Sequence, residues 1–316
     1  EKALNHSKKI GIDECEIVVV KKKITTVRIT DSEIAEIKQN FDESYGIRII
    51  HQKKIASNQT TDKQNINKNI ENIFDTISNL KPREFWEELP YKSRLKKLDG
   101  VFDEKLENIS GSNAMDIAQD MINSTINNKV STITGSLNIV SEDVQLSNSN
   151  GLELADESTY ITGIINAESE FGNIPVSGIG HASGRTLLNF SAERIGKDAK
   201  NMCIKAINPQ KIDSGKYSII FEPYSVGELL AFVVAANFNF KTFSEKKSCF
   251  SNDLDKKIGI DELNLIDDPH IPEGIGTKSI DDEGIETQKR NLIENGIFKN
   301  TFSNLYDSFK EGVKST

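Results

Sequence analysis

Cysteine is scarce in this sequence. The 316 residues include only Cys15, Cys203 and Cys249, which lie far apart and form no Cys-x-x-Cys pair. An odd number of widely spaced cysteines provides no disulfide framework and is typical of a protein in a reducing compartment. No secretory signal peptide is recognisable either. We therefore predict a cytoplasmic protein without a disulfide framework.

Long apolar runs and an excess of positive charge are also missing. The most apolar run, residues 229–236, is far shorter than the roughly 18 residues that a membrane-spanning helix needs. The formal net charge of −9 opposes binding to nucleic-acid phosphates. A basic cluster at residues 92–98 is short, and we interpret it as a solvated loop. We predict neither a membrane nor a nucleic acid as a partner.

Familiar catalytic motifs are absent as well. The four histidines are His6, His51, His181 and His270, and no two of them have the spacing of a helical metal pair. The sequence contains no His-Glu-x-x-His and no Gly-x-Ser-x-Gly. Those are the signatures of a common zinc peptidase and of an α/β-hydrolase. On these residues alone, the chain carries no convincing active site.

What is present is a mixture of strand and helix patterns. β-Branched residues and period-two alternation predict strands at residues 16–21, 25–30 and 33–38, and two more short strands within residues 45–57. The apolar residues that follow have helical spacing: Ile66, Ile70, Ile73, Phe74 and Ile77. This order predicts a sheet with a helix packed over it.

The middle of the chain repeats both patterns. A second helix is predicted around residues 113–127, and strands joined by turns between residues 129 and 170, with the clearest turn at 147–151. A glycine-rich loop is expected at residues 171–184, followed by a helix near residues 187–207.

The last third begins with a short strand of the buried type at residues 217–221. Pro223 then opens a helix with an apolar stripe, which we expect to be buried. Asn295-Gly296 predicts a hairpin, and a short helix is expected at residues 302–309. The predicted fold class is α+β: an N-terminal β-sheet with a packed helix (1–100), a central helix and strand region (101–210) and a C-terminal α+β domain (211–316).

Polar groups that could serve a site gather in two short segments. These candidates are Asp267, Asp268, His270, Asp281, Asp282 and Glu283. In "DDPHIPEG", carboxylates and an imidazole could ligate a metal, or an Asp could cap a proline-bounded turn. In "SIDDEGIET", the carboxylates could hold a cation, accept hydrogen bonds from a peptide backbone, or cap a turn before Gly284. His181, in "GIGHASG", could face a ligand or belong to a turn.

Several of these segments, in their order, resemble the TldD/PmbA (TldD/TldE) family. The resemblance rests on "IIFEP", "GELLAF", "DDP", "DDEG" and "LIENGIF" in the last third, and on "IGIDECEIVVVKKK" and the strand at residues 46–49 in the first. It implies membership in a family whose members pair as two related subunits and form a zinc metallopeptidase that acts on unstructured peptides. The family's C-terminal domain usually continues past the equivalent of residue 316, so we expect this domain to be incomplete here.

The resemblance also locates the family's catalytic motif. The zinc-bearing subunit carries His-Glu-x-x-x-His on the helix after the proline-containing strand. With Pro223 and Gly227 as anchors, the motif's three positions fall on Ala231, Phe232 and Ala236. None of these side chains can ligate zinc or move a proton.

The resemblance therefore implies a PmbA/TldE-like member without catalytic or metal-binding residues of its own. No cofactor is expected in this chain, and zinc is expected in a partner subunit. The partner would be a TldD-like zinc-bearing subunit or a second copy of this chain. The six acidic-segment residues above would line a cleft for an extended peptide.

Two other functions stay open. One is an active metal-dependent hydrolase whose site is assembled from scattered residues such as His181, His270 and Asp281. The other is a stand-alone peptide-binding or scaffold protein. The family label "modulator of DNA gyrase" suggests a link to DNA, but the charge balance opposes direct DNA binding.

Overall fold

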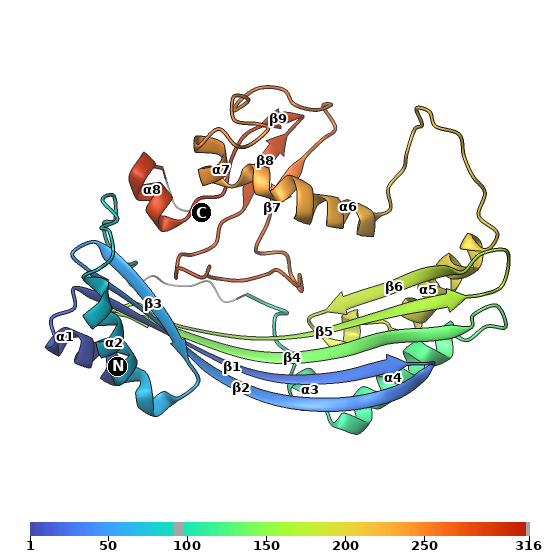
Figure 1. The fold of residues 1–316 in the computed structure, drawn as a ribbon, viewed down its shortest axis with the longest axis horizontal. Helices are drawn as coiled ribbons and strands as arrows, with labels where there is room; N and C mark the ends of the chain where they lie inside the picture. The colour runs from blue at the N-terminus through green and yellow to red at the C-terminus, as the bar shows by residue number, and fades with distance from the viewer. Residues whose placement is uncertain (92–97, 314–316) are drawn as a thin grey trace.

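The computed structural model describes residues 1–91 and 98–313, so all but the last residue of the predicted basic loop lies outside the described residues. The fold is α+β, as predicted (Figure 1). Its large sheet contains β1 (Glu14–Thr30), β2 (Glu33–His51), β3 (Lys54–Thr60), β4 (Thr132–Asn148), β5 (Glu153–Ser169) and β6 (Val176–Gly184). All neighbours are antiparallel, in the order β3-β2-β1-β4-β5-β6.

The strands are longer than the sequence pattern predicted. The two strands expected at 16–21 and 25–30 are one strand, β1, because three consecutive lysines continue the ladder instead of ending it. Lys22 pairs across the sheet with Asp42 on β2 and with Glu142 on β4, and its ammonium lies 2.5 Å from the Glu142 carboxylate. Opposite charges facing one another across strands stabilise a sheet, so the basic run remains in the strand.

The two faces of β1 have different neighbours, because successive side chains of a strand point to opposite faces. Cys15, Ile17, Val27 and Ile29 are buried against helices. These helices are α1 (Lys2–Lys9) and α2 (Ile66–Ile77) at one end of the sheet, and α4 (Gly111–Thr125) and α5 (Ala192–Ala206) at the other, with the short α3 (Glu104–Glu107) beside them. The alternate residues 16, 18, 20 and 22 face the other way, towards the C-terminal part of the chain. Figure 1 shows the sheet curving around that side.

The helix predicted from Ile66 to Ile77 is confirmed as α2. The glycine-rich loop predicted at residues 171–184 is largely wrong, because its second half is the edge strand β6. Gly178 and Gly180 point at α5, where a Cβ on Gly180 would lie 1.9 Å from the carbonyl oxygen of Ile195. Glycine is therefore needed here for close packing of a helix backbone on a strand, and not for a flexible loop.

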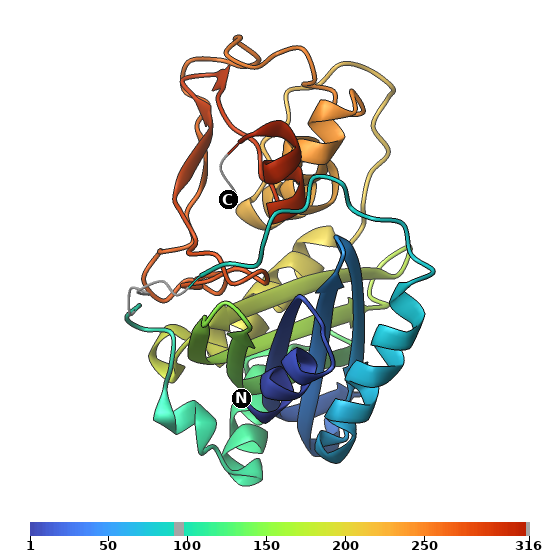
Figure 2. The same ribbon diagram turned by 90° about the vertical axis from the view of Figure 1, so that its left-hand side faces the viewer.

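The C-terminal lobe lies over the concave side of the large sheet (Figure 2). It contains α6 (Pro223–Leu229), α7 (Phe240–Ser244), α8 (Leu305–Glu311) and a small sheet of β7 (Leu265–Asp267), β8 (Arg290–Glu294) and β9 (Ile297–Phe298). The predicted hairpin is confirmed: Asn295 and Gly296 both adopt positive φ, 49° and 74°, between β8 and β9. Phe238 and Phe298 are fully buried at the centre of this lobe.

The large sheet takes β1–β3 from before residue 100 and β4–β6 from after it. The division of the chain into segments 1–100, 101–210 and 211–316 stays a prediction. Across residues 1–91 and 98–313, no helix combines the length and the apolar character that crossing a membrane requires.

Candidate functional site

The apolar run after Pro223 forms an interrupted helix on the surface. The α-helix α6 is followed by a π-helical turn, Leu230–Val234, and a 3-10 turn, Ala235–Phe238. The prediction that this helix is buried is wrong, since the Phe232 side chain is 83% exposed and only Phe238 is buried. The strand expected at residues 217–221 is wrong too: the segment has no strand partner in the described chain, and Ile220 is 97% exposed.

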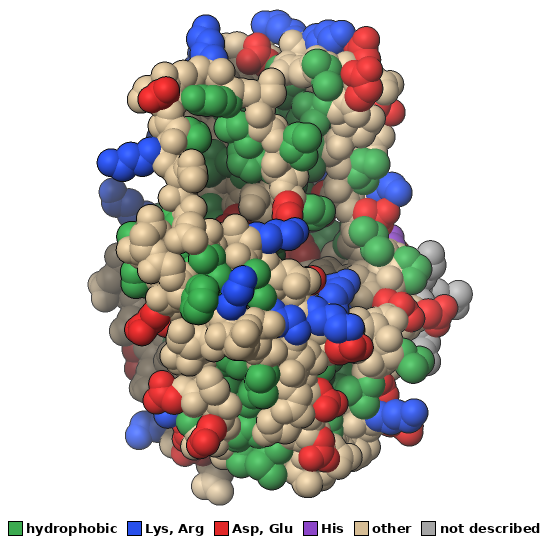
Figure 3. All heavy atoms as spheres, turned by 90° about the vertical axis from the view of Figure 1, so that its right-hand side faces the viewer, with side chains coloured by type: hydrophobic (Ala, Val, Ile, Leu, Met, Phe, Trp, Pro, Cys, Tyr) green, Lys and Arg blue, Asp and Glu red, His purple; other side chains and the backbone are tan. Residues whose placement is uncertain are grey.

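An exposed apolar surface therefore extends from Tyr217 to Val233. Its large side chains are Tyr217, Ile219, Ile220, Phe221, Tyr224, Val226, Leu229, Phe232 and Val233. Figure 3 views the molecule from the α5 end of the sheet and shows hydrophobic side chains around a hollow in the upper half. The apolar periodicity indicated that these side chains avoid water. It cannot tell whether they are buried by their own chain or by another molecule. A contiguous apolar surface of this kind marks an interaction site.

The three positions to which the resemblance assigns the zinc motif lie in the interrupted helix that carries part of this surface. Ala231 and Phe232 belong to the π-helical turn, Ala236 belongs to the 3-10 turn, and all three are exposed. A zinc site needs imidazole, thiolate or carboxylate donors, and two methyl groups and a phenyl ring supply none. Elsewhere in residues 1–91 and 98–313, no three His, Cys, Asp or Glu side chains are grouped so that they could hold a metal ion. The residues present do not fit a catalytic zinc.

The first acidic segment forms a hydrogen-bonded turn. Asp268 accepts a hydrogen bond from the backbone N–H of His270 and pairs with Lys289 at 2.7 Å, which together lower the pKa of its carboxyl, the lysine contact most. The Nε2 atom of His270 lies 3.2 Å from the hydroxyl of Thr287. Asp267, at the end of β7, lines a shallow cavity with Asp281 and Asp282. The alternative of a turn capped by Asp therefore describes Asp268 and His270.

The second segment contains one structural cap and one open carboxylate. Asp281 Oδ1 accepts hydrogen bonds from the backbone N–H groups of Glu283 and Ile285, so it caps the turn before Gly284, whose φ is 80°. The Asp282 side chain is 98% exposed, 3.7 Å from the Lys278 ammonium. Glu283 is partly buried, and its Oε2 accepts the N–H of Leu305 at the start of α8.

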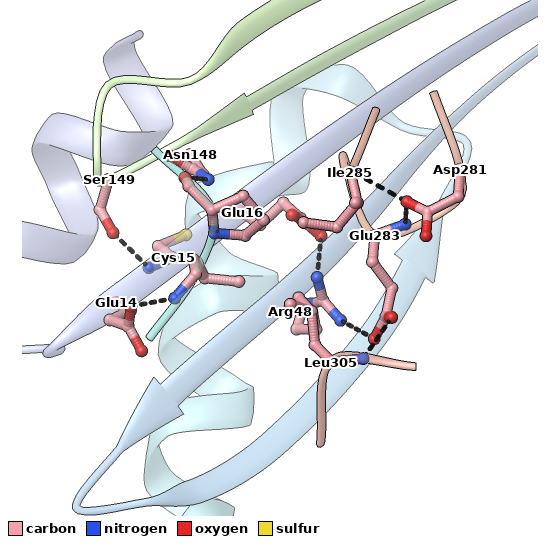
Figure 4. Close-up of polar contacts among 12 residues, drawn as sticks. Glu14, Cys15, Glu16, Arg48, Asn148, Ser149, Asp281, Glu283, Ile285 and Leu305 are labelled. Atoms are coloured by element: carbon pink, nitrogen blue, oxygen red, sulfur yellow. Dashed lines mark hydrogen bonds and ion pairs between the residues drawn. The ribbon is translucent and has the colours of Figure 1, made fainter. Parts of the chain in front are cut away.

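Glu283 also belongs to a partly buried polar cluster that the sequence did not reveal. Figure 4 shows Arg48 of β2 between Glu16 of β1 and Glu283 of the C-terminal lobe. The guanidinium lies 2.9 Å from Glu16 and 3.9 Å from Glu283, and Glu16 is only 3% exposed. Burial raises the pKa of both glutamates above their ordinary value in spite of the arginine. The signal available in the sequence was a charged residue, Glu16, at the start of an otherwise apolar strand pattern.

A cavity of about 480 Å³ lies between the concave face of the sheet and residues 275–282. Its sheet wall comes from β1, β4 and β5, and its other wall includes Ile280, Asp281 and Asp282. Of the predicted cleft residues, only Asp281 and Asp282 line this cavity. The volume falls in the usual range of small-ligand sites.

Arg185 fixes the outer wall of this cavity. Its side chain is 3% exposed, just after the end of β6. The Nη2 atom donates to the carbonyls of Ile275, at 2.5 Å, and Thr277, at 3.0 Å, while Nε donates to Gly274. One planar guanidinium thus donates hydrogen bonds to three carbonyls of a loop that has no regular structure of its own. Sequence reasoning gave no role to this residue.

His181 does not join the other sequence candidates. It sits on β6, near the Thr162 hydroxyl at 3.3 Å and the Tyr224 ring, with ring centroids 5.8 Å apart. Burial, followed by the charge of Arg194, lowers the pKa of its imidazole. His270 and Asp281 belong to the C-terminal lobe, where both are engaged in the turns described above. The scattered residues proposed for an active hydrolase are thus not assembled in the described chain.

Solved structures share this whole fold. TldE from Thermococcus kodakarensis aligns with a TM-score of 0.87 at 20% identity, over 100% of this chain and 72% of that one. A candidate modulator of DNA gyrase from Bacteroides thetaiotaomicron aligns with a TM-score of 0.90 at 21% identity, over 100% and 73%. These likenesses define the class of protein by its fold: an α+β protein built like TldE.

Sequence comparison then identifies the family. The family model for "PmbA/TldA metallopeptidase domain 1" matches residues 15–81, and the model for "PmbA/TldA metallopeptidase C-terminal domain" matches residues 214–316. An uncharacterised protein of Methanocaldococcus jannaschii is 24% identical over 100% of this chain and 73% of its own length. Metalloprotease PmbA of Escherichia coli O157:H7 is 29% identical over 42% of this chain and 30% of its own length. The chain belongs to the PmbA/TldD family, which confirms the resemblance noted in the sequence.

Proposed function

We propose that this chain is a non-catalytic, PmbA/TldE-like subunit of a TldD/TldE-type zinc metallopeptidase that acts on unstructured peptides. The chain would pair with a zinc-bearing TldD-like relative, or with itself, in the cytoplasm. Its role would be to shape the chamber and to bind extended peptide, while the partner supplies the zinc.

The observation that carries this proposal is the chemistry of the helix after Pro223. Positions 231, 232 and 236, where the family's catalytic subunit has two histidines and a glutamate, hold Ala, Phe and Ala. Peptide hydrolysis by a metal-bound water needs metal ligands and a general base within reach of that water. These side chains provide neither function, so the hydrolytic step is assigned to another chain.

The exposed apolar surface at residues 217–233 supports the assembly part of the proposal. Phe221 and Phe232 are 54% and 83% exposed, and Val233 is 58% exposed. Burial of such surface contributes about 25 cal/mol per Å², so a partner that covers it gains a large hydrophobic contribution. The same helix would then face the partner instead of a metal ion.

The cavity over the concave sheet supports the peptide-binding part. Asp281 and Asp282 line it, and Asp267 lines the neighbouring shallow cavity. Asp268, His270 and Glu283 instead hold the surrounding loops in place through the contacts described above. The proposed cleft thus has an acidic wall in which Asp282 is open to solvent and Asp281 also caps a turn, while the other three candidates are structural.

A peptidase assay tests the proposal. An unstructured, fluorescently quenched peptide is incubated with this chain alone, with a zinc-motif relative alone and with an equimolar mixture. We expect cleavage by the mixture at least about tenfold above the sum of the separate chains, abolished by a zinc chelator and insensitive to Ala231→Ser. Cleavage by the lone chain at the rate of the mixture, or a mixture no more active than its parts, would contradict the subunit role.

A further inference from the structure

The cavity above the sheet has an apolar floor that becomes polar along β5. Strand register places Val20 of β1, Val144 of β4 and Asp156 of β5 side by side on the concave face. The neighbouring row of residues on this face contains the apolar pair Val18 and Leu146, which lie opposite one another on β1 and β4. All five side chains line the same cavity. A ligand lying along this floor would meet aliphatic groups first and the Asp156 carboxylate at the end of the row.

The positive groups of the cavity are already engaged. Lys22 pairs with Glu142 at 2.5 Å, and Lys278 lies 3.7 Å from Asp282. The Arg185 guanidinium donates to backbone carbonyls. Within the part of the chain that the structure describes, no group forms an ion pair with Asp156. Among the described residues, the cavity wall contains three cations (Lys22, Lys278 and Arg185) and four carboxylates (Glu142, Asp156, Asp281 and Asp282), which leaves one negative charge within this set.

Asp156 is the side chain where this charge is least compensated. It is half-buried, and burial raises the pKa of its carboxyl more than the nearby Arg185 and Lys278 lower it. Asp281, by comparison, accepts two backbone hydrogen bonds. A half-buried carboxylate without a direct ion-pair contact is stabilised by a ligand that brings a cation.

The opposite wall is held rigidly enough to define the shape of the site. Arg185 anchors residues 274–277, and Ile280 packs with Leu146, Leu152 and Leu154 on the sheet. Because both walls are fixed by contacts within the chain, a ligand that fits the space loses little free energy to rearrangement.

We propose that this cavity binds a lysine or arginine side chain of an extended peptide, with the aliphatic stem on Val20 and Val144 and the cationic head at Asp156. The ligand class follows from the geometry: a single positive charge at the end of an apolar stem matches an apolar floor that ends in one unpaired carboxylate. The peptide context rests on the proposed function, whereas the match to the side chain rests on the cavity alone.

The test uses two small probes with the same four-carbon stem, Nα-acetyl-lysine methylamide, which ends in an ammonium group, and Nα-acetyl-norleucine methylamide, which lacks it. Binding to the full 316-residue chain is followed by NMR chemical shifts and by isothermal titration. We expect the lysine probe to bind about tenfold more tightly than the norleucine probe, as for one charge-assisted contact. Asp156→Asn should remove this difference. Asp143→Asn, which changes the other face of β4 in the same way, should keep it.

Far-ultraviolet circular dichroism and thermal unfolding establish that Asp156→Asn is folded. Equal affinities of the two probes, a lysine preference that survives Asp156→Asn, or no saturable lysine-dependent shift at the cavity overturns the proposal. Unstructured peptides with one central lysine or norleucine form a second arm. If both peptides bind equally and the probes show no preference, the cavity assignment fails and peptide binding stands. If the lysine probe binds but neither peptide does, the cavity assignment stands and the peptide-binding role fails.

Discussion

Gly180→Ala is expected to destabilise the protein by about 3 kcal/mol or more, or to prevent folding. An added Cβ would lie 1.9 Å from the carbonyl oxygen of Ile195 and 2.8 Å from the backbone nitrogen of Ala199. Both atoms belong to the backbone of α5, so the contact can be relieved only by moving the helix away from β6. That movement would open the core that α5 shares with α4 and the sheet. Chemical denaturation, with soluble yield as a second readout, measures the effect.

Gly227→Ala is the matched control. Gly227 lies within α6, its φ is not positive, and nothing lies within 4 Å of an added Cβ. Alanine is favoured over glycine by about 1 kcal/mol in a helix, so this variant should be as stable as the parent or slightly more stable. If Gly180→Ala unfolded at the same denaturant concentration as Gly227→Ala, the close packing of β6 on α5 would be wrong.

Arg185→Met should lower the free energy of unfolding by about 3 kcal/mol and release the outer wall of the cavity. The substitution keeps the apolar stem but removes the donors to the carbonyls of Gly274, Ile275 and Thr277. The carbonyl of the buried Thr277 would lose its donor, which is costly, and residues 274–277 have no strand or helix to hold them. Limited proteolysis followed by mass spectrometry should show faster cleavage between residues 269 and 287.

The Arg185→Lys variant distinguishes the effect of the positive charge at this position from the effect of the guanidinium geometry. Lysine carries the same charge but cannot reproduce the planar fork that reaches several carbonyls at once, so we expect an intermediate loss of stability and intermediate protease sensitivity. An Arg185→Met protein with unchanged unfolding and an uncleaved loop would show that the wall is held by other contacts.

The sequence predicted elements well wherever local pattern decides the structure. The isoleucines from 66 to 77 repeat at helical spacing and form α2, and Asn295-Gly296 supplies the two positive-φ residues of a tight hairpin. Both depend on interactions between residues near in the chain. The α+β class and the family followed from these elements and from motifs in their order.

The sequence-based predictions failed where residues distant in the chain determine the local structure. The lysines at 21–23 resemble a strand break until Asp42 and Glu142 are placed beside them by the sheet. Gly178 and Gly180 resemble a loop until α5 is laid across them. The apolar helix after Pro223 was expected in a core because an apolar pattern indicates which residues avoid water. The pattern does not indicate whether the same chain or a partner buries them.

The site was predictable only in part. The acidic segments were found because consecutive carboxylates stand out, and Asp281 and Asp282 do line a cavity. Arg185, Glu16 and Arg48 were missed because each is an isolated residue whose partners lie far away in the sequence, such as Thr277 for Arg185. Asp156 was missed because only the sheet places it in the cavity. Burial and charge balance, which only a structure provides, single them out.

The proposed subunit role requires that this chain does not hold a catalytic zinc ion by itself. The direct measurement is the zinc content of the purified chain after equilibrium dialysis against buffered zinc, determined by mass spectrometry of the metal. Because Ala231, Phe232 and Ala236 offer no ligand atoms, we expect far less than one zinc per chain, and about one per pair once a zinc-motif relative is bound. One tightly bound zinc in each lone chain, lost together with peptidase activity on chelation, would contradict the account.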